Sequence, residues 1–329
     1  MREEAVDVDA LSVVYRNSVR AVDDVSLVIK RGELFALVGP NGAGKTTLMK
    51  VLTTLLKPTS GRAYVCGLDV VREAGQVRRR IGYVPQNLSA DDELTGMENM
   101  LLQCRLYGVS GREAVKRSRQ LLEVVGLLDA ANRVVASYSG GMRRRLEIAM
   151  GLVNTPEVLF MDEPTLGLDV QSRLVIWDYI KTLRKQEDIT IIFTTHYMEE
   201  ADKLSQRLGI IDRGRIVALG SPEELKRRIG GDIIALEAEG DVEGLLRRLS
   251  FVDSVSLVNG GYRVKVVDGE ENLPKILNTL NENGVKVRKV TLIKPSLDQV
   301  FVEFTGREYK EEEPPDYLMQ TFIRSSRRR

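Results

Sequence analysis

The sequence predicts an α/β protein with a largely parallel sheet, followed by a small α+β domain. Between Val6 and about Ser221, apolar runs typical of strands alternate with stretches in which apolar residues recur every three or four positions, as in helices. From about Leu94 to Val135 the pattern is almost purely helical, which indicates a helical insert. From about Gly231 the expected elements follow the order βαββαβ, which is that of a ferredoxin-like domain.

The composition fits a folded protein and excludes several functional classes. The chain has 329 residues, 43% hydrophobic and 29% charged, and this length is typical of two domains. Its net charge of +1 gives no reason to expect a nucleic-acid partner or an anionic membrane surface. One histidine excludes zinc sites built on several histidines, and the two cysteines, Cys66 and Cys104, are typical of a reducing compartment. No apolar run approaches the roughly 20 residues that span a bilayer, and no signal peptide is visible, so we expect a cytoplasmic protein.

In the first domain, four apolar runs contain the expected strands: residues 26–39, 157–164, 189–196 and 207–220. Three amphipathic stretches are the expected helices: residues 46–56, 111–128 and 172–186. Because parallel strands end at the same edge of a sheet, side chains that follow these strands are expected to gather where ligands bind in open α/β sheets.

The second domain is expected at residues 231–306. Its predicted strands lie at 232–240, within 252–269 and at 285–294, and its predicted helices lie at 241–250 and 272–284. The middle region reads as a hairpin that turns at Asn259-Gly260-Gly261. The domain has no phosphate-binding motif and no cluster of metal ligands, so it is expected to be accessory. For the charged tail, 307–329, we favour a solvated, flexible segment over a docking peptide.

A glycine-rich motif of the form GxxxxGK[ST] follows the strand that ends at Val38 and precedes a helix. Its glycines allow backbone N–H groups to surround phosphate oxygens, and the helix adds its positive N-terminal end. Lys45 supplies a cation for the β- and γ-phosphates, and the Thr46 hydroxyl is a magnesium ligand. The sequence therefore predicts a nucleotide site at Gly39, Pro40, Asn41, Gly42, Ala43, Gly44, Lys45, Thr46 and Thr47.

Two carboxylates and a histidine follow neighbouring strands. Asp162 and Glu163 end the buried run at 157–164, where Asp162 is expected to hold Mg²⁺ and Glu163 to act as the general base toward water. His196 follows the next strand, at the same edge of the sheet. From there an imidazole could contact a γ-phosphate or the attacking water, although a lone histidine is more often structural.

Together these residues resemble the nucleotide-binding subunits of ABC transporters over about Val6 to Ser221. Ser139-Gly140-Gly141, followed by Met142, corresponds to the ABC signature, which in the family meets the γ-phosphate held by a second nucleotide-binding domain. The resemblance implies a P-loop NTPase core with an antiparallel β subdomain, within residues 1–230, and a helical subdomain at about 88–150.

The resemblance also implies roles for four further residues. Gln86 matches the glutamine that contacts Mg²⁺ and water and senses the membrane partner. Asp169 matches the D-loop aspartate at the nucleotide, His196 the switch histidine, and Tyr15 the aromatic that stacks on adenine. A plain strand tyrosine is the alternative for Tyr15.

Two departures from the signature point to one branch of the family. Tyr138 stands where leucine is usual and Met142 where glutamine is usual. This form resembles the drug- and daunorubicin-resistance exporters, and the segment after Gly231 resembles their C-terminal domain. For the basic run Arg143–Arg145 we expect a largely solvated helix face rather than a phosphate contact.

The resemblance implies an ATPase with ATP and Mg²⁺ as cofactors. Because the chain has one P-loop and one signature, two ATP sites require a homodimer or a pair with a related subunit. A separate permease would provide the path for drugs, lipids or polysaccharides and would hold the subunit at the inner face of the cell membrane. The alternatives are a soluble ABC ATPase acting on DNA or ribosomes, and a non-hydrolysing, ATP-gated regulatory protein.

Overall fold

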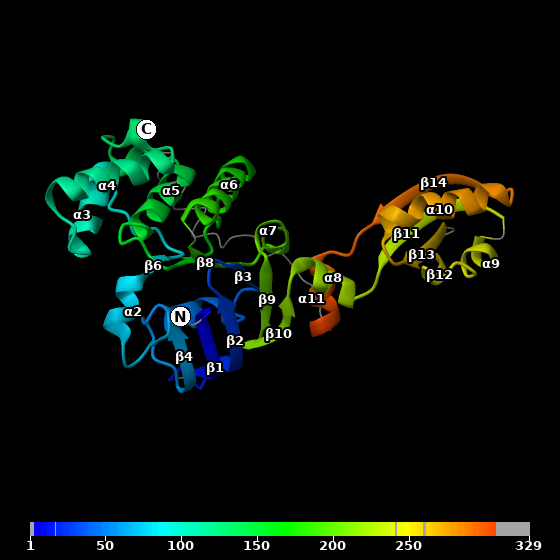
Figure 1. Ribbon diagram of the computed structural model, residues 1–329, viewed down its shortest axis with the longest axis horizontal. Coiled ribbons are helices and arrows are strands. Elements are labelled where there is room, and N and C mark those ends of the chain that lie inside the picture. The colour runs from blue at the N-terminus through cyan, green and yellow to red at the C-terminus, as the bar shows by residue number, and fades with distance from the viewer. Residues whose placement is uncertain (1–2, 17, 188, 241, 259–260, 307–329) are drawn as a thin grey trace. The chain divides into compact units, whose positions relative to one another are not determined.

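The computed structural model describes residues 3–16, 18–187, 189–240, 242–258 and 261–306. The chain falls into two compact units, with the boundary between Leu219 and Gly220 (Figure 1). Each unit has its own hydrophobic core. The tail expected at residues 307–329 lies outside the described residues.

The first unit is built around a six-stranded sheet. Its strands are β3 (Leu34–Val38), β6 (Ile81–Val84), β7 (Val158–Asp162), β8 (Thr190–Thr195), β9 (Arg207–Asp212) and β10 (Arg215–Gly220). They lie in the order β10-β9-β3-β8-β7-β6, and all the pairs from β9 to β6 are parallel. Every residue of β3, β7 and β8 is buried, which explains why these strands read as continuous apolar runs.

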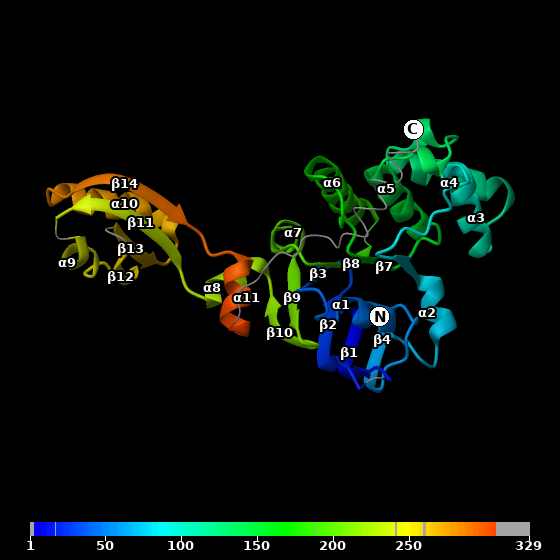
Figure 2. The same ribbon diagram turned by 180° about the vertical axis from the view of Figure 1, so that it is seen from behind.

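Helices cover both faces of this sheet. They are α1 (Lys45–Leu52), α5 (Gly140–Gly151), α6 (Val170–Glu187) and α7 (Met198–Leu204). Helix α1 lies on one side of the sheet, and α5 and α6 lie on the other (Figure 2). The predicted alternation of strands and helices, and the parallel sheet that it implies, are therefore confirmed.

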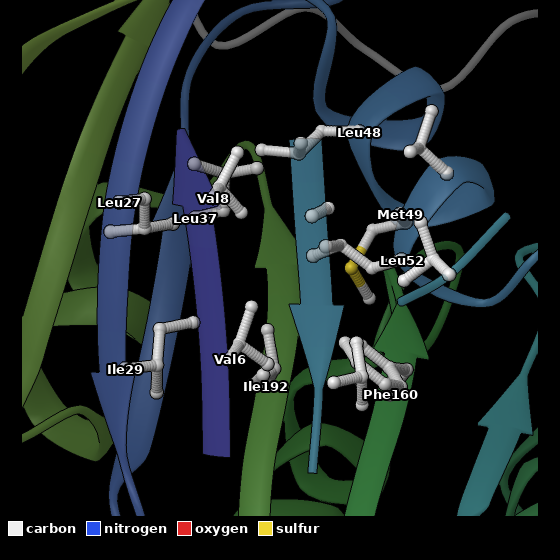
Figure 3. Packing of buried hydrophobic residues seen from close by; sticks show 14 of the residues in the cluster. Val6, Val8, Leu27, Ile29, Leu37, Leu48, Met49, Leu52, Phe160 and Ile192 are labelled. Carbon is white, nitrogen blue, oxygen red and sulfur yellow. The ribbon is translucent and has the colours of Figure 1, made fainter. Parts of the chain in front are cut away.

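A second, antiparallel sheet packs against α1 and completes the core of the first unit. It consists of β1 (Glu4–Val14), β2 (Arg20–Lys30), β4 (Ser60–Val65) and β5 (Leu68–Asp69), in the order β2-β1-β4-β5. The apolar run at 26–39 thus contains two strands, because the chain turns at Gly32, whose φ is 68°. Figure 3 shows the core, where side chains of β1 and β2 face α1 and the parallel sheet: Val6, Val8, Leu27, Ile29, Leu48, Met49, Leu52, Phe160 and Ile192.

The predicted helical insert lies between β6 and β7. Helix α2 (Ala74–Arg80) precedes β6, and the insert contains α3 (Gly96–Leu106), α4 (Gly111–Val124), the short helices η1 (Leu128–Ala130) and η2 (Val135–Ser137), and then α5. Thr95 and Glu98 form a capping box that begins α3. In the part of the chain that the structure describes, no helix combines the length and the apolar character needed to cross a bilayer.

The second unit has the predicted ferredoxin-like fold. Its elements are α8 (Pro222–Arg228), β11 (Asp232–Glu239), α9 (Val242–Leu246), β12 (Val252–Val258), β13 (Gly261–Val266), α10 (Gly269–Glu282), β14 (Lys286–Ile293) and α11 (Leu297–Thr305). The antiparallel sheet has the order β12-β13-β11-β14. Residues 259–260 of the expected hairpin turn lie outside the described residues. Helix α8 contacts α11, so this unit begins before the boundary expected at residue 231.

Candidate active site

The P-loop connects the central strand β3 to α1, and its glycines are required by close backbone contacts. A Cβ at Gly39 would lie 2.2 Å from the carbonyl oxygen of Ile211. Gly44 has a φ of 107°, and a Cβ there would lie 2.2 Å from the carbonyl oxygen of Ala21. Both positions exclude a side chain, so the loop can curl tightly before α1 begins at Lys45.

Lys45 lies inside this loop. Its Nζ donates hydrogen bonds to the carbonyl oxygens of Gly39, at 2.7 Å, and Pro40, at 3.1 Å. The same Nζ lies 3.2 Å from Glu163 Oε1, and both side chains are 5% exposed. The ammonium group therefore connects the phosphate-binding loop with the acids that follow β7.

Asp162 accepts two hydroxyl hydrogen bonds on one oxygen. Thr194 Oγ1 donates to Asp162 Oδ1 at 2.6 Å, and Thr46 Oγ1 donates to it at 3.2 Å. The second oxygen, Oδ2, is buried and has no hydrogen-bond partner among the described residues. Burial raises the pKa of Asp162, against the opposing effect of the two hydroxyls. A buried, unpaired carboxylate oxygen beside the Thr46 hydroxyl fits a divalent cation with oxygen ligands.

Glu163 contacts both Lys45 and the only histidine. Its Oε2 lies 2.5 Å from His196 Nδ1. Burial acts to raise the pKa of Glu163, but the contact with His196 and the charge of Lys45 outweigh it and keep the pKa below its usual value. The carboxylate is thus ionised at neutral pH. Lys45, Glu163 and His196 form one continuous buried chain, and adjacent strands β3, β7 and β8 bring them together.

Tyr15 lies beside the end of the P-loop. It follows β1, is 39% exposed, and its hydroxyl oxygen lies 3.3 Å from Thr47 Oγ1. An exposed aromatic ring next to a phosphate-binding loop is available to stack on a base.

Two groups of polar side chains near the site were not indicated by the motifs. Thr194 accepts a hydrogen bond from the Glu163 N–H at 2.9 Å while donating to Asp162. Glu200, fully buried on α7, accepts from Thr195 at 2.5 Å, and from Thr165 and Trp177 at 2.8 Å each. The pair of threonines at the end of a buried strand was the available signal for Thr194. Nothing in the sequence pattern distinguished Glu200 from its exposed neighbour, Glu199.

The signature residues begin helix α5. Ser139 is exposed and caps the helix, its Oγ accepting from the N–H of Met142 at 3.3 Å. Gly140 is half-buried. Gly141 packs against the start of α6, where an added Cβ would lie 2.9 Å from Ser172 Oγ. Both carboxylate oxygens of Asp169 accept hydrogen bonds from Ser172, so Asp169 caps α6 beside the signature.

The signature's unusual first residue has a structural explanation. Tyr138 is buried, and its hydroxyl donates to the carbonyl oxygen of Ala130 at 2.7 Å. The same hydroxyl oxygen would lie 2.3 Å from a Cβ on Gly96, so the tyrosine occupies space that this glycine leaves open. Tyr138 therefore joins α5 to the rest of the helical insert.

The expectation of a solvated face for Arg143–Arg145 is wrong. Arg144 is buried, and its Nη2 donates to the carbonyl oxygen of Gln86 at 2.9 Å. Arg143 is half-buried and pairs with Asp92, and Arg145 donates to the carbonyl oxygen of Val125 at 2.9 Å. Consecutive side chains project from different sides of an α-helix, so each of the three arginines contacts a different neighbour. Gln86 itself is half-buried, just after the edge strand β6.

The site thus contains two groups of predicted residues. Lys45, Thr46, Asp162, Glu163 and His196 form one connected group at the carboxyl ends of β3, β7 and β8. Ser139, Gly141 and Asp169 form a second group at the adjoining starts of α5 and α6. The first group offers a cation for phosphate, oxygen ligands for a metal ion and a carboxylate base. The second offers an exposed helix start with an uncharged hydroxyl.

Comparison with known proteins gives the family. Residues 22–166 match the ABC transporter family, and residues 220–305 match the C-terminal domain of DrrA1-3-like ATP-binding proteins. The chain is 41% identical to daunorubicin resistance ATP-binding protein DrrA3 of Streptomyces coeruleorubidus, over 93% of this chain and 97% of that protein. It is 36% identical to linearmycin resistance ATP-binding protein LnrL of Bacillus subtilis, over 87% and 94%. These relatives favour the transporter subunit over both alternatives.

Solved structures agree with this assignment. A dimeric ATP-binding cassette in a post-hydrolysis state, bound to ADP and Pi, is 28% identical, with a TM-score of 0.60 over 66% of this chain and 98% of that one. CbiO1 of Clostridium perfringens, part of an ABC transporter complex, is 28% identical, with a TM-score of 0.64 over 69% and 94%. The chain therefore belongs to the ATP-binding subunits of ABC transporters: it binds and hydrolyses ATP, couples hydrolysis to transport, and carries a DrrA-like C-terminal domain.

Proposed function

We propose that the buried chain Lys45–Glu163–His196 is the catalytic centre for hydrolysis of ATP with bound Mg²⁺. The backbone N–H groups of the P-loop and Lys45 bind the β- and γ-phosphates, and Tyr15 stacks on adenine. Thr46, Asp162 and Gln86 would hold a magnesium ion, which would supply charge stabilisation to the phosphates. The unpaired Oδ2 of buried Asp162 supports this assignment.

Glu163 accepts the proton of the attacking water in this proposal. Its carboxylate is held ionised by His196 and Lys45. When Lys45 turns toward the phosphates, Glu163 loses a neighbouring cation, so its pKa rises and its oxygen becomes a stronger base. His196 keeps the carboxylate in position and orients it toward the water. Ionisation and orientation of one buried carboxylate are thus controlled by its two partners.

Two chains complete two ATP sites. One chain carries a single P-loop and a single signature, and Ser139 is exposed at the start of α5. Ser139, Gly140 and Gly141 of one subunit would contact the γ-phosphate held by Lys45 of the other, with Asp169 at the same interface. A homodimer, or a pair with a related subunit, is the assembly that this arrangement requires.

The transport partner is a separate membrane permease, and the cargo is a drug-like compound. Relatives at 36–41% identity include proteins named for resistance to daunorubicin, doxorubicin or linearmycin and, at 39%, for Nod factor export, which supports export over import. Bound to the permease, the subunit would lie on the cytoplasmic side of the cell membrane. Isolation of the chain from its native membrane and identification of the co-purified permease test this part of the proposal.

The Glu163→Gln variant tests the catalytic assignment. It keeps the size of the side chain but removes the base, so we expect ATP affinity to be retained while phosphate release falls by about 10²-fold or more. The variant should also accumulate as an ATP-bound dimer in size-exclusion chromatography. Hydrolysis at the wild-type rate would exclude Glu163 as the base.

The Lys45→Ala variant is the complementary test. It removes the only cation that the structure places inside the P-loop, among the described residues, so ATP affinity itself should fall. Exposed Lys50, on the same helix, provides the control through Lys50→Ala, which should bind ATP normally. Unchanged ATP affinity in Lys45→Ala would contradict the P-loop assignment.

A further inference from the structure

A buried ion pair lies on the signature helix. Arg144 Nη1 is 3.1 Å from Glu147 Oε2, one turn apart on α5, and their side chains are 4% and 1% exposed. Removing two charges from water is unfavourable, and apolar side chains of similar size often fill such a space without loss of stability. A buried ion pair is therefore weak evidence that these two residues serve stability alone. The other hydrogen bonds of their polar atoms indicate a second role.

Both members of the pair bind the same segment, residues 85–90. Arg144 donates to two successive carbonyl oxygens, Pro85 at 2.7 Å and Gln86 at 2.9 Å. Glu147 Oε1 accepts from the N–H and hydroxyl groups of Ser89 and from the N–H of Ala90 at 3.3 Å. The segment is thus held on either side of the Gln86 side chain.

This segment has no regular secondary structure of its own. It follows β6 and precedes α3, and its backbone groups find partners on α5 side chains instead of in a helix or a sheet. Because these hydrogen bonds come from side chains of α5, the path of the loop depends on the position of α5. Ser139 caps the start of the same helix, within two turns of Arg144.

We propose that Arg144 and Glu147 are positioning residues that fasten the Gln86 loop to the signature helix, so that the two move as one body. This inference rests on the roles proposed above for Gln86 and Ser139. When α5 turns toward a partner subunit, the backbone of Gln86 turns with it. A change at either end, such as nucleotide binding at Ser139 or permease binding near Gln86, is then transmitted to the other end through five charge-assisted hydrogen bonds.

The neighbouring arginines show that this contact is specific to one face of α5. Arg143 pairs with exposed Asp92, and Arg145 binds the carbonyl oxygens of Val125 and Gly126. Within the described residues, the hydrogen bonds of these two arginines do not reach the Gln86 loop. Arg143 therefore offers a matched control on the same helix.

The double variant Arg144→Met/Glu147→Leu tests the proposal in the full-length chain. It replaces the pair by apolar side chains of similar size, which should preserve the fold, and removes the hydrogen bonds that Arg144 and Glu147 make to residues 85–90. We expect amide hydrogen exchange at Ser89 and Ala90 to become about tenfold faster or more. We also expect kcat for ATP hydrolysis to fall about tenfold or more, with the Kd for ATP unchanged, because the P-loop is untouched.

Arg143→Met is the control and should keep wild-type kcat and wild-type exchange in this loop. Wild-type kcat or wild-type exchange at Ser89 and Ala90 in a folded double variant would overturn the proposal. If the double variant does not unfold cooperatively, Arg144→Lys decides by the same two measurements, because it keeps the charge but cannot bind both carbonyl groups and Glu147. Failure of the proposed function is a separate result: the wild-type chain would not hydrolyse ATP, or Lys45→Ala would bind it normally.

Discussion

His196 is the only imidazole in the chain, and its Nδ1 lies 2.5 Å from the carboxylate of Glu163. In His196→Ala that carboxylate loses the partner that orients it, so we expect kcat to fall about 10²-fold while ATP affinity changes little. Phosphate release from purified protein measures the effect, and no second histidine can compensate. Glu199→Ala, an exposed change on α7, is the control. Unaltered kcat in His196→Ala would show that the histidine has no part in hydrolysis.

Glu200 predicts a pH dependence of stability at the residue scale. Burial raises its pKa, against the opposing hydrogen bonds of Thr195, Thr165 and Trp177. An unfolded glutamate titrates near pH 4.3, so above that pH the folded state binds more protons than the unfolded state until the raised pKa is passed. Over this window the wild-type free energy of unfolding should fall with rising pH relative to Glu200→Gln. Urea unfolding of both proteins across pH 4–8 measures it, and a constant difference would contradict the raised pKa.

At the element scale, the conformation of the P-loop depends more on Gly44 than on Gly42. Gly44→Ala places a Cβ 2.2 Å from a backbone oxygen at a φ of 107°, so the loop must move before α1. Gly42 has a φ of 76° but nothing within 4 Å of an added Cβ. We expect Gly44→Ala to lower ATP affinity at least tenfold, and Gly42→Ala to cost only about 1 kcal/mol of backbone strain. Equal ATP affinities, measured by calorimetry, would contradict this ranking.

At the scale of the whole molecule, the two units have separate cores and should unfold separately. A fragment of residues 220–306 contains all of α8 to α11 and should show a cooperative thermal transition on its own. A fragment of residues 231–306 lacks α8, which packs on α11 and buries Leu225. We expect this shorter fragment to melt at a lower temperature, as followed by circular dichroism. Equal melting temperatures would place the boundary near residue 231 instead.

Much of the candidate active site is predictable from the sequence because its residues directly follow buried strands. The P-loop after Val38, the acids at Asp162 and Glu163, and His196 each follow an apolar run whose end lies at one edge of a parallel sheet. The fold class followed from the same alternation of strands and helices. The sequence pattern places helix α8 with the first domain, because its capping box and its composition do not indicate which of the two cores Leu225 joins.

The sequence by itself determined the family, the parallel sheet, the glycine-rich loop after β3 and the position of Glu163, the proposed base, because those features depend on local pattern and on residue type. Only the tertiary structure decided which of three consecutive arginines is buried and that Glu147 pairs with it. The tertiary structure further decided that both side chains bind the Gln86 loop, whose bonded residues lie 57 to 59 positions away in the sequence. It also decided that Glu200 is buried while Glu199 is exposed. The physical reason is that a polar side chain acquires its partners, and therefore its role, from elements that are distant in sequence.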